Sequence, residues 1–278
     1  MGRNDWLRIV SQTSPTRQET PAGWRLSWHE GGATFELARP EKLNSLSRGM
    51  LQAMAECLDE LERRGGRELI ITGEGERAFC AGADLAAATR TQASDDESLR
   101  GFERRLFSRL SESRVTSVAA INGLAYGGGL ELAMACTFRI AAPHAKFALP
   151  EVKVGVIPSY GGTQFLPALI GPARALDLML TGRSVDTAEA YAMGLVSRIA
   201  QPGLPLIEQA RELAGQVTRH SQVAIDAIRR CVAAAGPRIT AEGLAAEQAQ
   251  FDVVMRSDDA AEGVRAFVEK RAPQFKHR

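Results

Sequence analysis

Apolar residues recur along the chain with two different periods, which predict strands and helices in the first half and helices in the second. Short uninterrupted apolar runs at residues 69–72 and 117–121 predict two buried strands. Residues 24–28 and 33–38 alternate on either side of a Gly-Gly turn and predict a hairpin. The expected fold class is therefore α/β, with one compact core and a helical appendage.

Helical spacing of apolar residues predicts the first long helix directly after Ser47. Leu51, Met54, Leu58 and Leu61 would lie on one face of that helix, and Ser47 is a residue type that caps helix N-termini. A pair of glycines at residues 65 and 66 predicts its end. Similar patterns predict further helices at residues 99–110, 173–180, 187–193, 204–218, 222–235, 242–255 and 258–271.

Changes in this pattern divide the chain into three expected parts. Residues 1–23 form a polar N-terminal extension, residues 24–200 the α/β core and residues 201–278 a C-terminal helical region. The extension mixes charges and lacks an apolar stretch, so a secretory signal is not expected there. Residues 88–98 are rich in Thr, Ser and Asp and predict a mobile loop within the core.

The near-neutral net charge argues against strongly charged binding partners. The chain of 278 residues has 34 Lys and Arg, 33 Asp and Glu and a net charge of +1, so neither nucleic acid nor a membrane is expected as a partner. A transmembrane helix needs about 18 consecutive apolar residues, and the sequence has no such stretch. The four cysteines lie far apart and match neither a zinc site nor a disulfide framework, which favours a reducing, cytoplasmic location.

Three consecutive glycines at residues 127–129 are the centre of the predicted chemistry. They follow a predicted buried strand and precede an apolar run that is typical of a helix. Glycines let a ligand approach the backbone closely, and the first N–H groups of a helix lack an intrahelical acceptor. Together with the helix dipole, these groups can hold a negatively charged oxygen, with the Glu131 carboxylate one turn further on. The alternative is a packed glycine turn followed by a solvated Glu131.

Other candidate chemistry has little support in the sequence. Residues 73–78 (GEGERA) superficially fit a dinucleotide-binding fingerprint, which requires a helix to begin at once. Residues 79–84 are expected to continue as a loop, so this interpretation is rejected. The four histidines are scattered, and none lies near a second potential ligand or a nucleophile, so no metal site is expected.

Several segments, taken together and in order, resemble the crotonase (enoyl-CoA hydratase/isomerase) superfamily, from about residue 24 to residue 278. They are residues 39–44 (RPEKLN), 78–85 (AFCAGADL), 122–131 (NGLAYGGGLE), 150–164 (PEVKVGVIPSYGGTQ) and 266–275 (AFVEKRAPQF). The resemblance implies a crotonase-like spiral of ββα units with a C-terminal helical trimerisation region. The assembly would be a homotrimer or a homohexamer built as a dimer of trimers, and the substrate would be an acyl-CoA thioester.

The resemblance also implies roles for individual residues. The backbone N–H groups of Ala83 and Gly128 would form an oxyanion hole for the thioester oxygen. Glu131 would take a proton from a water that attacks Cβ, while Glu151 would deliver a proton to Cα. Coenzyme A is part of the substrate, and no metal or redox cofactor is expected. Further implied substrate-binding residues are Lys42, Leu43, Ala81, Gly82, Asp84, Leu85, Gly127, Pro150 and Ser159.

The presence of both glutamates favours one reaction within this superfamily. Its hydratases resemble one another in carrying two glutamates twenty residues apart, and here 151 − 131 = 20. The expected activity is therefore that of an enoyl-CoA hydratase, which adds water across the 2,3 double bond of a 2-enoyl-CoA. One alternative is an enoyl-CoA isomerase of the same fold, which needs only the equivalent of Glu151. The other is a non-catalytic or RNA-binding relative.

Some residues depart from the family pattern, among them Ser159, Phe165 and Thr137. Ser159 stands where hydratases commonly have a glycine whose N–H lies near the catalytic water, so the added side chain is expected to crowd or re-orient that water. Phe165 stands where arginine is usual, and Thr137 replaces a common aspartate. These last two changes are expected to be structural.

Overall fold

The computed structural model describes residues 18–19, 23–84, 101–234 and 241–278. The predicted loop at residues 88–98, the start of the helix predicted from residue 99 and most of the N-terminal extension lie outside these ranges. By internal contacts the chain divides into two compact units, Met1–Ala214 and Gly215–Arg278. The boundaries expected after residues 23 and 200 stay predictions.

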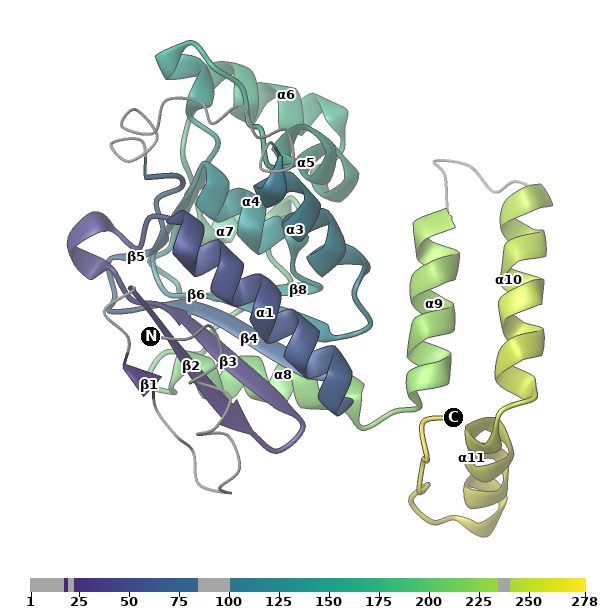
Figure 1. Ribbon diagram of the computed structural model, residues 1–278. Helices are drawn as coiled ribbons and strands as arrows, with labels where there is room; N and C mark the ends of the chain where they lie inside the picture. Colours follow the sequence, from purple (N-terminus) through teal and green to yellow (C-terminus); the bar gives the residue numbers. More distant parts are fainter. Residues whose placement is uncertain (1–17, 20–22, 85–100, 235–240) are drawn as a thin grey trace. The chain divides into compact units, whose positions relative to one another are not determined.

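Two sheets form the framework of the first unit (Figure 1). Their strands are β1 (Gln18–Glu19), β2 (Trp24–His29), β3 (Gly32–Leu37), β4 (Glu68–Gly73), β5 (Ala78–Cys80), β6 (Thr116–Ile121), β7 (Leu124–Tyr126), β8 (Phe138–Ala141), β9 (Lys146–Ala148), β10 (Val185–Asp186) and β11 (Arg198–Ile199). The larger sheet has the order β1-β2-β3-β4-β6-β8-β11, and the smaller has the order β10-β9-β7-β5. The hairpin of β2 and β3 is antiparallel, as predicted.

Helices alternate with these strands in a regular way. Those up to residue 218 are η2 (Pro40–Lys42), α1 (Arg48–Arg64), α3 (Phe102–Glu112), α4 (Gly128–Ala135), η4 (Glu151–Val154), α5 (Gly162–Ile170), α6 (Pro172–Thr181), α7 (Thr187–Ala192) and α8 (Leu206–Thr218). In each of the pairs β4 and β5, β6 and β7, and β8 and β9, the first strand joins the larger sheet and the second joins the smaller. The three pairs precede α3, α4 and α5, respectively. The first strands of successive pairs are parallel to one another, and so are the second strands. The predicted spiral of ββα units is therefore confirmed.

The core of this unit covers both faces of the larger sheet. Leu69 and Ile71 of β4 join one apolar cluster with the buried face of α1. Ile70 of β4 and Val118 of β6 join a second cluster with Ala210 of α8. Successive side chains of a strand point to opposite faces, so β4 contributes to both clusters. Burial on both faces explains why the two strands are uninterrupted apolar runs, as predicted.

The first predicted helix is confirmed together with both of its ends. The Ser47 hydroxyl accepts a hydrogen bond from the N–H of Met50 at 3.3 Å, which satisfies one of the free donors at the start of α1. Gly65 follows the helix with φ of 70°, in the left-handed region that favours glycine. The local sequence therefore determines both where this helix begins and where it ends.

One local prediction is wrong, because residues 79–84 are not all loop. Phe79 and Cys80 belong to β5, which pairs with the equally short β7. Three residues are too few to produce a recognisable alternation, so neither strand could be read from the pattern. Residues 74–84 still contain no helix, and the dinucleotide fingerprint therefore lacks the helix it requires.

The second unit is helical, as predicted for the C-terminal region. Its helices are α9 (Gln222–Ala234), α10 (Ala241–Met255) and α11 (Asp258–Glu269). Arg230 of α9 donates a hydrogen bond to Gln250 of α10 at 2.9 Å. Carboxylates of α11 hold the end of the chain, since Asp259 accepts the N–H of Lys276 at 2.6 Å. None of the helices that the structure describes is long and apolar enough to cross a membrane.

Candidate active site

Two backbone N–H groups from successive turns of the spiral lie close together at the start of α4. A Cβ atom built onto Gly128 would lie 3.6 Å from the Ala83 nitrogen. Gly128 is the first residue of α4, so its N–H has no acceptor within the helix. Within the described residues, no acceptor takes a hydrogen bond from either N–H. The pair, at the positive end of a helix, has the arrangement expected of an oxyanion hole.

The other two glycines of the triplet are required by their surroundings. Gly127 has φ of 52°, a conformation that residues with a Cβ rarely adopt. A Cβ atom on Gly129 would lie only 2.1 Å from the carbonyl oxygen of Cys80 in β5. The glycines therefore let α4 begin directly against β5, which carries the chain to Ala83.

Main-chain hydrogen bonds on both sides of Ala83 determine where its N–H points. Leu46 pairs with Ala83 as a parallel bridge. The Leu46 N–H donates to the Gly82 oxygen at 2.8 Å, and the Asp84 N–H donates to the Leu46 oxygen at 3.2 Å. Because groups on neighbouring residues of an extended chain point to opposite sides, the Ala83 N–H faces away from Leu46.

Asp84, the residue after Ala83, forms an ion pair that fixes the loop in place. The Arg39 guanidinium lies 2.7 Å from the Asp84 carboxylate, and these two side chains are 14% and 10% exposed. Arg39 also donates a hydrogen bond to the Ser45 oxygen at 3.0 Å. The half-exposed Lys42 ammonium lies 3.3 Å from the same carboxylate. Asp84 therefore ties the loop that carries Ala83 to the segment that follows β3.

Replacing Asp84 with Asn should loosen this loop. Loss of a nearly buried charged hydrogen bond is expected to lower the free energy of unfolding by about 1–3 kcal/mol, and to lower kcat because Ala83 is less firmly held. Urea unfolding and initial rates measure the two effects. Asp177→Asn is the matched control, because Asp177 pairs with Arg183 at an exposed site where the expected cost is about 0–1 kcal/mol. Equal effects of the two substitutions on both readouts would contradict the role of Asp84.

Glu131 is buried in the first turn of α4, with 2% of its surface exposed. One carboxylate oxygen accepts the N–H groups of Tyr160 at 2.8 Å and Gly162 at 2.7 Å. The pKa of Glu131 is raised to about 7, mainly by burial; the N–H groups of Gly162 and Tyr160 lower it, and the charge of Glu151 contributes to the rise. A carboxylate with this pKa is suited to exchange protons near neutral pH.

Glu151 begins η4 and carries the second carboxylate of the site. One of its oxygens lies 3.2 Å from a Cβ atom built onto Gly127. Its other oxygen is buried and has no hydrogen-bond partner among the described residues. Burial raises the pKa of Glu151. A buried carboxylate oxygen without a partner is unfavourable for stability, which is typical of a group kept for function.

The enoyl-CoA hydratase/isomerase family matches residues 29–278. The chain belongs to this family. A probable enoyl-CoA hydratase of Bacillus subtilis is 41% identical over 237 residues, which are 84% of this chain and 91% of that protein. A crotonyl-CoA hydratase of Syntrophomonas wolfei is 35% identical over 247 residues, 87% of this chain and 94% of that protein. An enoyl-CoA hydratase crystal structure from Bacillus anthracis matches with a TM-score of 0.83 and 34% identity, over 92% of this chain and all of that one.

The structure brings most of the site residues expected for this family to one place. Ala83, Gly128, Glu131 and Glu151 surround the start of α4, as the contacts above show. Leu43 and Ala81 are joined by a main-chain hydrogen bond of 3.0 Å. Gly82 and Asp84 flank Ala83 in the same loop, Lys42 contacts Asp84, Gly127 precedes α4, and Pro150 directly precedes Glu151. Leu85 lies outside the described residues.

The loop that carries Ser159 also holds Glu131, through residues that the sequence did not single out. Ser159 is exposed, whereas the N–H groups that hold Glu131 belong to Tyr160 and Gly162. Tyr160 was not among the expected site residues, although its ring lies against Gly128. An aromatic residue directly before the Gly161-Gly162 pair is the sequence feature at this position, and it does not by itself indicate a role in the site.

The other two departures from the family pattern have structural roles, as predicted. The Phe165 ring packs on Gly161, where an added Cβ would lie 2.6 Å from a ring carbon. Thr137 and Ser117 exchange hydrogen bonds, and the Thr137 N–H donates to the Ser117 hydroxyl at 2.9 Å. Thr137 therefore ties the end of α4 to strand β6.

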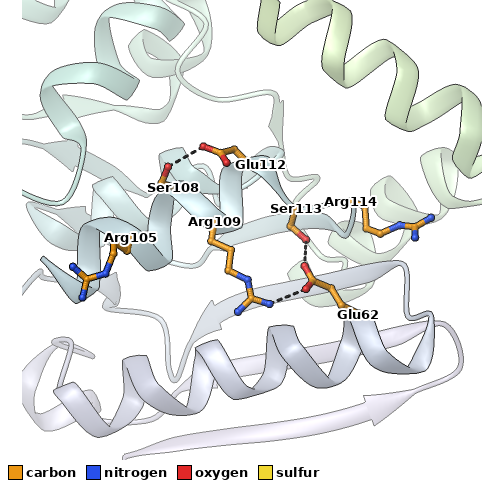
Figure 2. A pocket seen from close by; sticks show the side chains of 7 residues that line it. All are labelled: Glu62, Arg105, Ser108, Arg109, Glu112, Ser113 and Arg114. Atoms are coloured by element: carbon orange, nitrogen blue, oxygen red, sulfur yellow. Dashed lines mark hydrogen bonds and ion pairs between the residues drawn. The ribbon is translucent and has the colours of Figure 1, made fainter. Parts of the chain in front are cut away.

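A separate pocket lies beside helices α1 and α3, and neither Glu131 nor Glu151 is among the residues that line it (Figure 2). Its volume is about 480 Å³. Arg109 points toward Glu62 and pairs with it at 2.7 Å, and the Ser113 hydroxyl donates to the same carboxylate at 3.0 Å. Because these charges satisfy one another, the pocket is explained as packing between two polar helix faces. Within the described ranges, no three His, Cys, Asp or Glu side chains are grouped to hold a metal ion.

Proposed function

We propose that the protein is an enoyl-CoA hydratase, which adds water across the 2,3 double bond of a 2-enoyl-CoA thioester. The observation that carries this proposal is the pair of buried carboxylates, Glu131 and Glu151, beside two backbone N–H groups without acceptors. Relatives named as hydratases at 35–41% identity support it. Coenzyme A enters as part of the substrate, and the reaction uses only groups of this chain and water.

The proposed oxyanion hole stabilises the charge that develops during the addition. The thioester oxygen accepts hydrogen bonds from the N–H groups of Ala83 and Gly128. As water attacks C3, the electron pair of the double bond moves toward the thioester and its oxygen becomes negative. Donors that are already in place stabilise this enolate, and each is worth about 10²–10³ in rate.

The two carboxylates then complete the proton transfers. Glu131, with one oxygen held by two N–H groups, takes a proton from the attacking water, and the hydroxyl group bonds to C3. Glu151, with a buried oxygen free of protein partners, delivers a proton to C2 and collapses the enolate. One water is consumed, and the pair as a whole neither gains nor loses a proton. Burial raises the pKa of both carboxylates and the charge of Glu151 also raises the pKa of Glu131, which favours a pair that holds one proton.

Double-bond isomerisation is the second candidate, since the family contains isomerases as well as hydratases. Moving a proton between two carbons requires one base, for which Glu151 suffices. Glu131 would then take no part in the reaction. Its burial disfavours the ionised form and so costs stability, which an isomerase would gain nothing from. The fixed position of Glu131 therefore favours the hydratase. A net charge of +1 gives no support to an RNA-binding role.

A panel of acyl-CoA thioesters tests the proposed activity. The panel contains saturated, 2-enoyl and 3-enoyl chains, and the products are identified by mass. We expect 2-enoyl-CoA to gain the mass of one water, with saturated chains unchanged. Rearrangement of 3-enoyl-CoA without hydration of any 2-enoyl-CoA would instead identify an isomerase.

We also propose that the chain assembles as a homotrimer or a homohexamer. Apolar side chains on both units are more than half exposed, and this surface would be buried by contact with further copies of the chain. In the first unit they include Val154, Ile157 and Leu180, and in the second Ile228, Val232 and Phe251. Light scattering at micromolar concentration should give three or six times the chain mass of 30.0 kDa. A monomer under these conditions would contradict the proposal.

A cytoplasmic location is proposed from the state of the cysteines. Cys57, Cys80 and Cys136 are buried free thiols, and burial raises the pKa of each to about 12. The more accessible Cys231 is also a free thiol. Four free cysteines, three of them unreactive through burial, suit a reducing compartment.

A further inference from the structure

We propose that Tyr160 sets the length of acyl chain that the enzyme accepts, because its ring closes the acyl site just beyond the reacting carbons. This role presupposes the proposed hydratase function and adds a specificity-determining residue to it. Tyr160 has a main-chain part that holds the catalytic carboxylate and a ring that lies against the oxyanion hole. The main-chain part fixes where the reacting carbons lie, and the ring limits the space beyond them.

The ring of Tyr160 is wedged between the start of α4 and helix α3. Two of its carbons lie 3.0 Å from a Cβ atom built onto Gly128, so the ring touches the residue that supplies one oxyanion donor. The ring also meets Phe107 of α3 edge to face, with 5.7 Å between ring centroids and 88° between planes. Phe107 is fully buried. The Tyr160 ring is therefore backed by the apolar core and resists displacement.

The direction of the acyl chain follows from the catalytic groups. With the thioester oxygen between Ala83 and Gly128, C2 must come within reach of Glu151 and C3 within reach of the water on Glu131. Glu131 is held at 2.8 Å by the N–H of Tyr160 itself. Atoms that follow C3 therefore enter the space next to Tyr160. The Tyr160 ring therefore blocks an acyl chain that extends more than a few carbons beyond C3.

The ring, and not the hydroxyl group, accounts for this effect. Burial raises the pKa of Tyr160 to about 12, and the nearby charges of Glu103 and Glu131 act in the same direction. The phenol is therefore neutral at any pH at which the enzyme is assayed. Phenylalanine at position 160 should preserve the wall, whereas alanine should open the acyl site toward Phe107.

Chain-length profiles test the proposal directly. For wild type, kcat/KM should be highest with 2-butenoyl-CoA and fall steeply toward 2-decenoyl-CoA. In Tyr160→Ala the ratio of kcat/KM for 2-decenoyl-CoA to that for 2-butenoyl-CoA should rise at least about tenfold, since one methylene in an apolar pocket can change the ratio by roughly 10–200-fold. Tyr160→Phe should keep the wild-type ratio. Tyr191→Ala is the matched control, because Tyr191 is an exposed tyrosine of α7.

Binding of saturated chains provides a readout that does not depend on the reaction. Calorimetry with butyryl-CoA and decanoyl-CoA should show the same selective gain for the long chain in Tyr160→Ala. If that variant does not fold, Tyr160→Leu replaces the ring with a smaller side chain and should also shift the preference toward the long chain. An unchanged chain-length preference in a folded variant, by rates or by binding, would overturn the role of Tyr160. A wild type that binds acyl-CoA with this preference but hydrates none would overturn the proposed function alone.

Discussion

Replacement of Glu131 by Gln is expected to lower kcat for hydration of 2-butenoyl-CoA by about 10²–10⁴-fold. Glutamine keeps the side-chain shape and can still accept the N–H groups of Tyr160 and Gly162 through its oxygen, but it cannot take a proton from water. Glu151→Gln should produce a loss of similar size, because the enolate then lacks its proton donor. The double variant should be scarcely worse than either single one, since the two carboxylates act as a unit in one addition of water.

The same substitution should change how activity depends on pH. Glu131 acts as a base only when it is ionised, and its pKa is about 7. Wild-type kcat/KM should therefore fall as pH drops below about 7, and this acidic limb should be absent from the residual activity of Glu131→Gln. Initial rates between pH 5 and 9 measure both profiles.

Stability measurements separate this catalytic loss from unfolding. The pKa of Glu131 is raised in the folded state, so stability falls as the pH rises from about 4.5, the ordinary value for glutamate, to about 7, and the whole cost is present at pH 8. Glu131→Gln should therefore unfold in urea at the same or a higher concentration than wild type at pH 8. Glu208→Gln, at an exposed position of α8, is the matched control and should leave both rate and stability unchanged. Retention of hydration within about tenfold in Glu131→Gln would contradict its role as the base.

A proline at position 83 is expected to lower kcat by at least about 10²-fold, because proline has no N–H to donate to the thioester oxygen. Ala83→Ser keeps the N–H and should have a mild effect. The hydrogen bonds that hold the loop on either side come from Leu46 and Asp84, and proline leaves those donors in place. The loss should therefore appear in the chemical step more than in substrate binding.

Binding of butyryl-CoA shows whether the proline has also displaced the loop. Retained binding together with a large loss of kcat would support an oxyanion donor at Ala83. Equal losses in Ala83→Pro and Ala83→Ser would show that the side chain matters and the amide does not. Loss of binding in the proline variant would leave the serine variant as the deciding comparison.

Much of the framework could be predicted because the relevant signals are local. The ends of α1 depend on Ser47 and Gly65, and the doubly buried strands β4 and β6 are continuous apolar runs. The context of Gly128, after a buried strand and before an apolar helix, correctly placed it at a helix N-terminus. Strands β5 and β7 could not be predicted, because three residues leave no periodic pattern.

The site itself could be predicted only in part, because its properties arise from distant segments. The sequence placed Glu131 beside the glycine triplet, but the pKa of this residue depends on burial and on N–H groups about thirty residues later. The ion pair between Arg39 and Asp84 joins segments 45 residues apart. Tyr160 could not be recognised from the sequence, since only the folded chain brings its ring against Gly128 and Phe107.

Incubation with 2-butenoyl-CoA in water enriched in ¹⁸O tests the proposed reaction most directly. If Glu131 deprotonates the attacking water and Glu151 protonates C2, the wild-type product gains the mass of one molecule of that labelled water, and neither Glu131→Gln nor Glu151→Gln forms it at a comparable rate. A wild type that incorporates no ¹⁸O, yet converts 3-butenoyl-CoA to 2-butenoyl-CoA at an undiminished rate in Glu131→Gln, would contradict the hydratase mechanism.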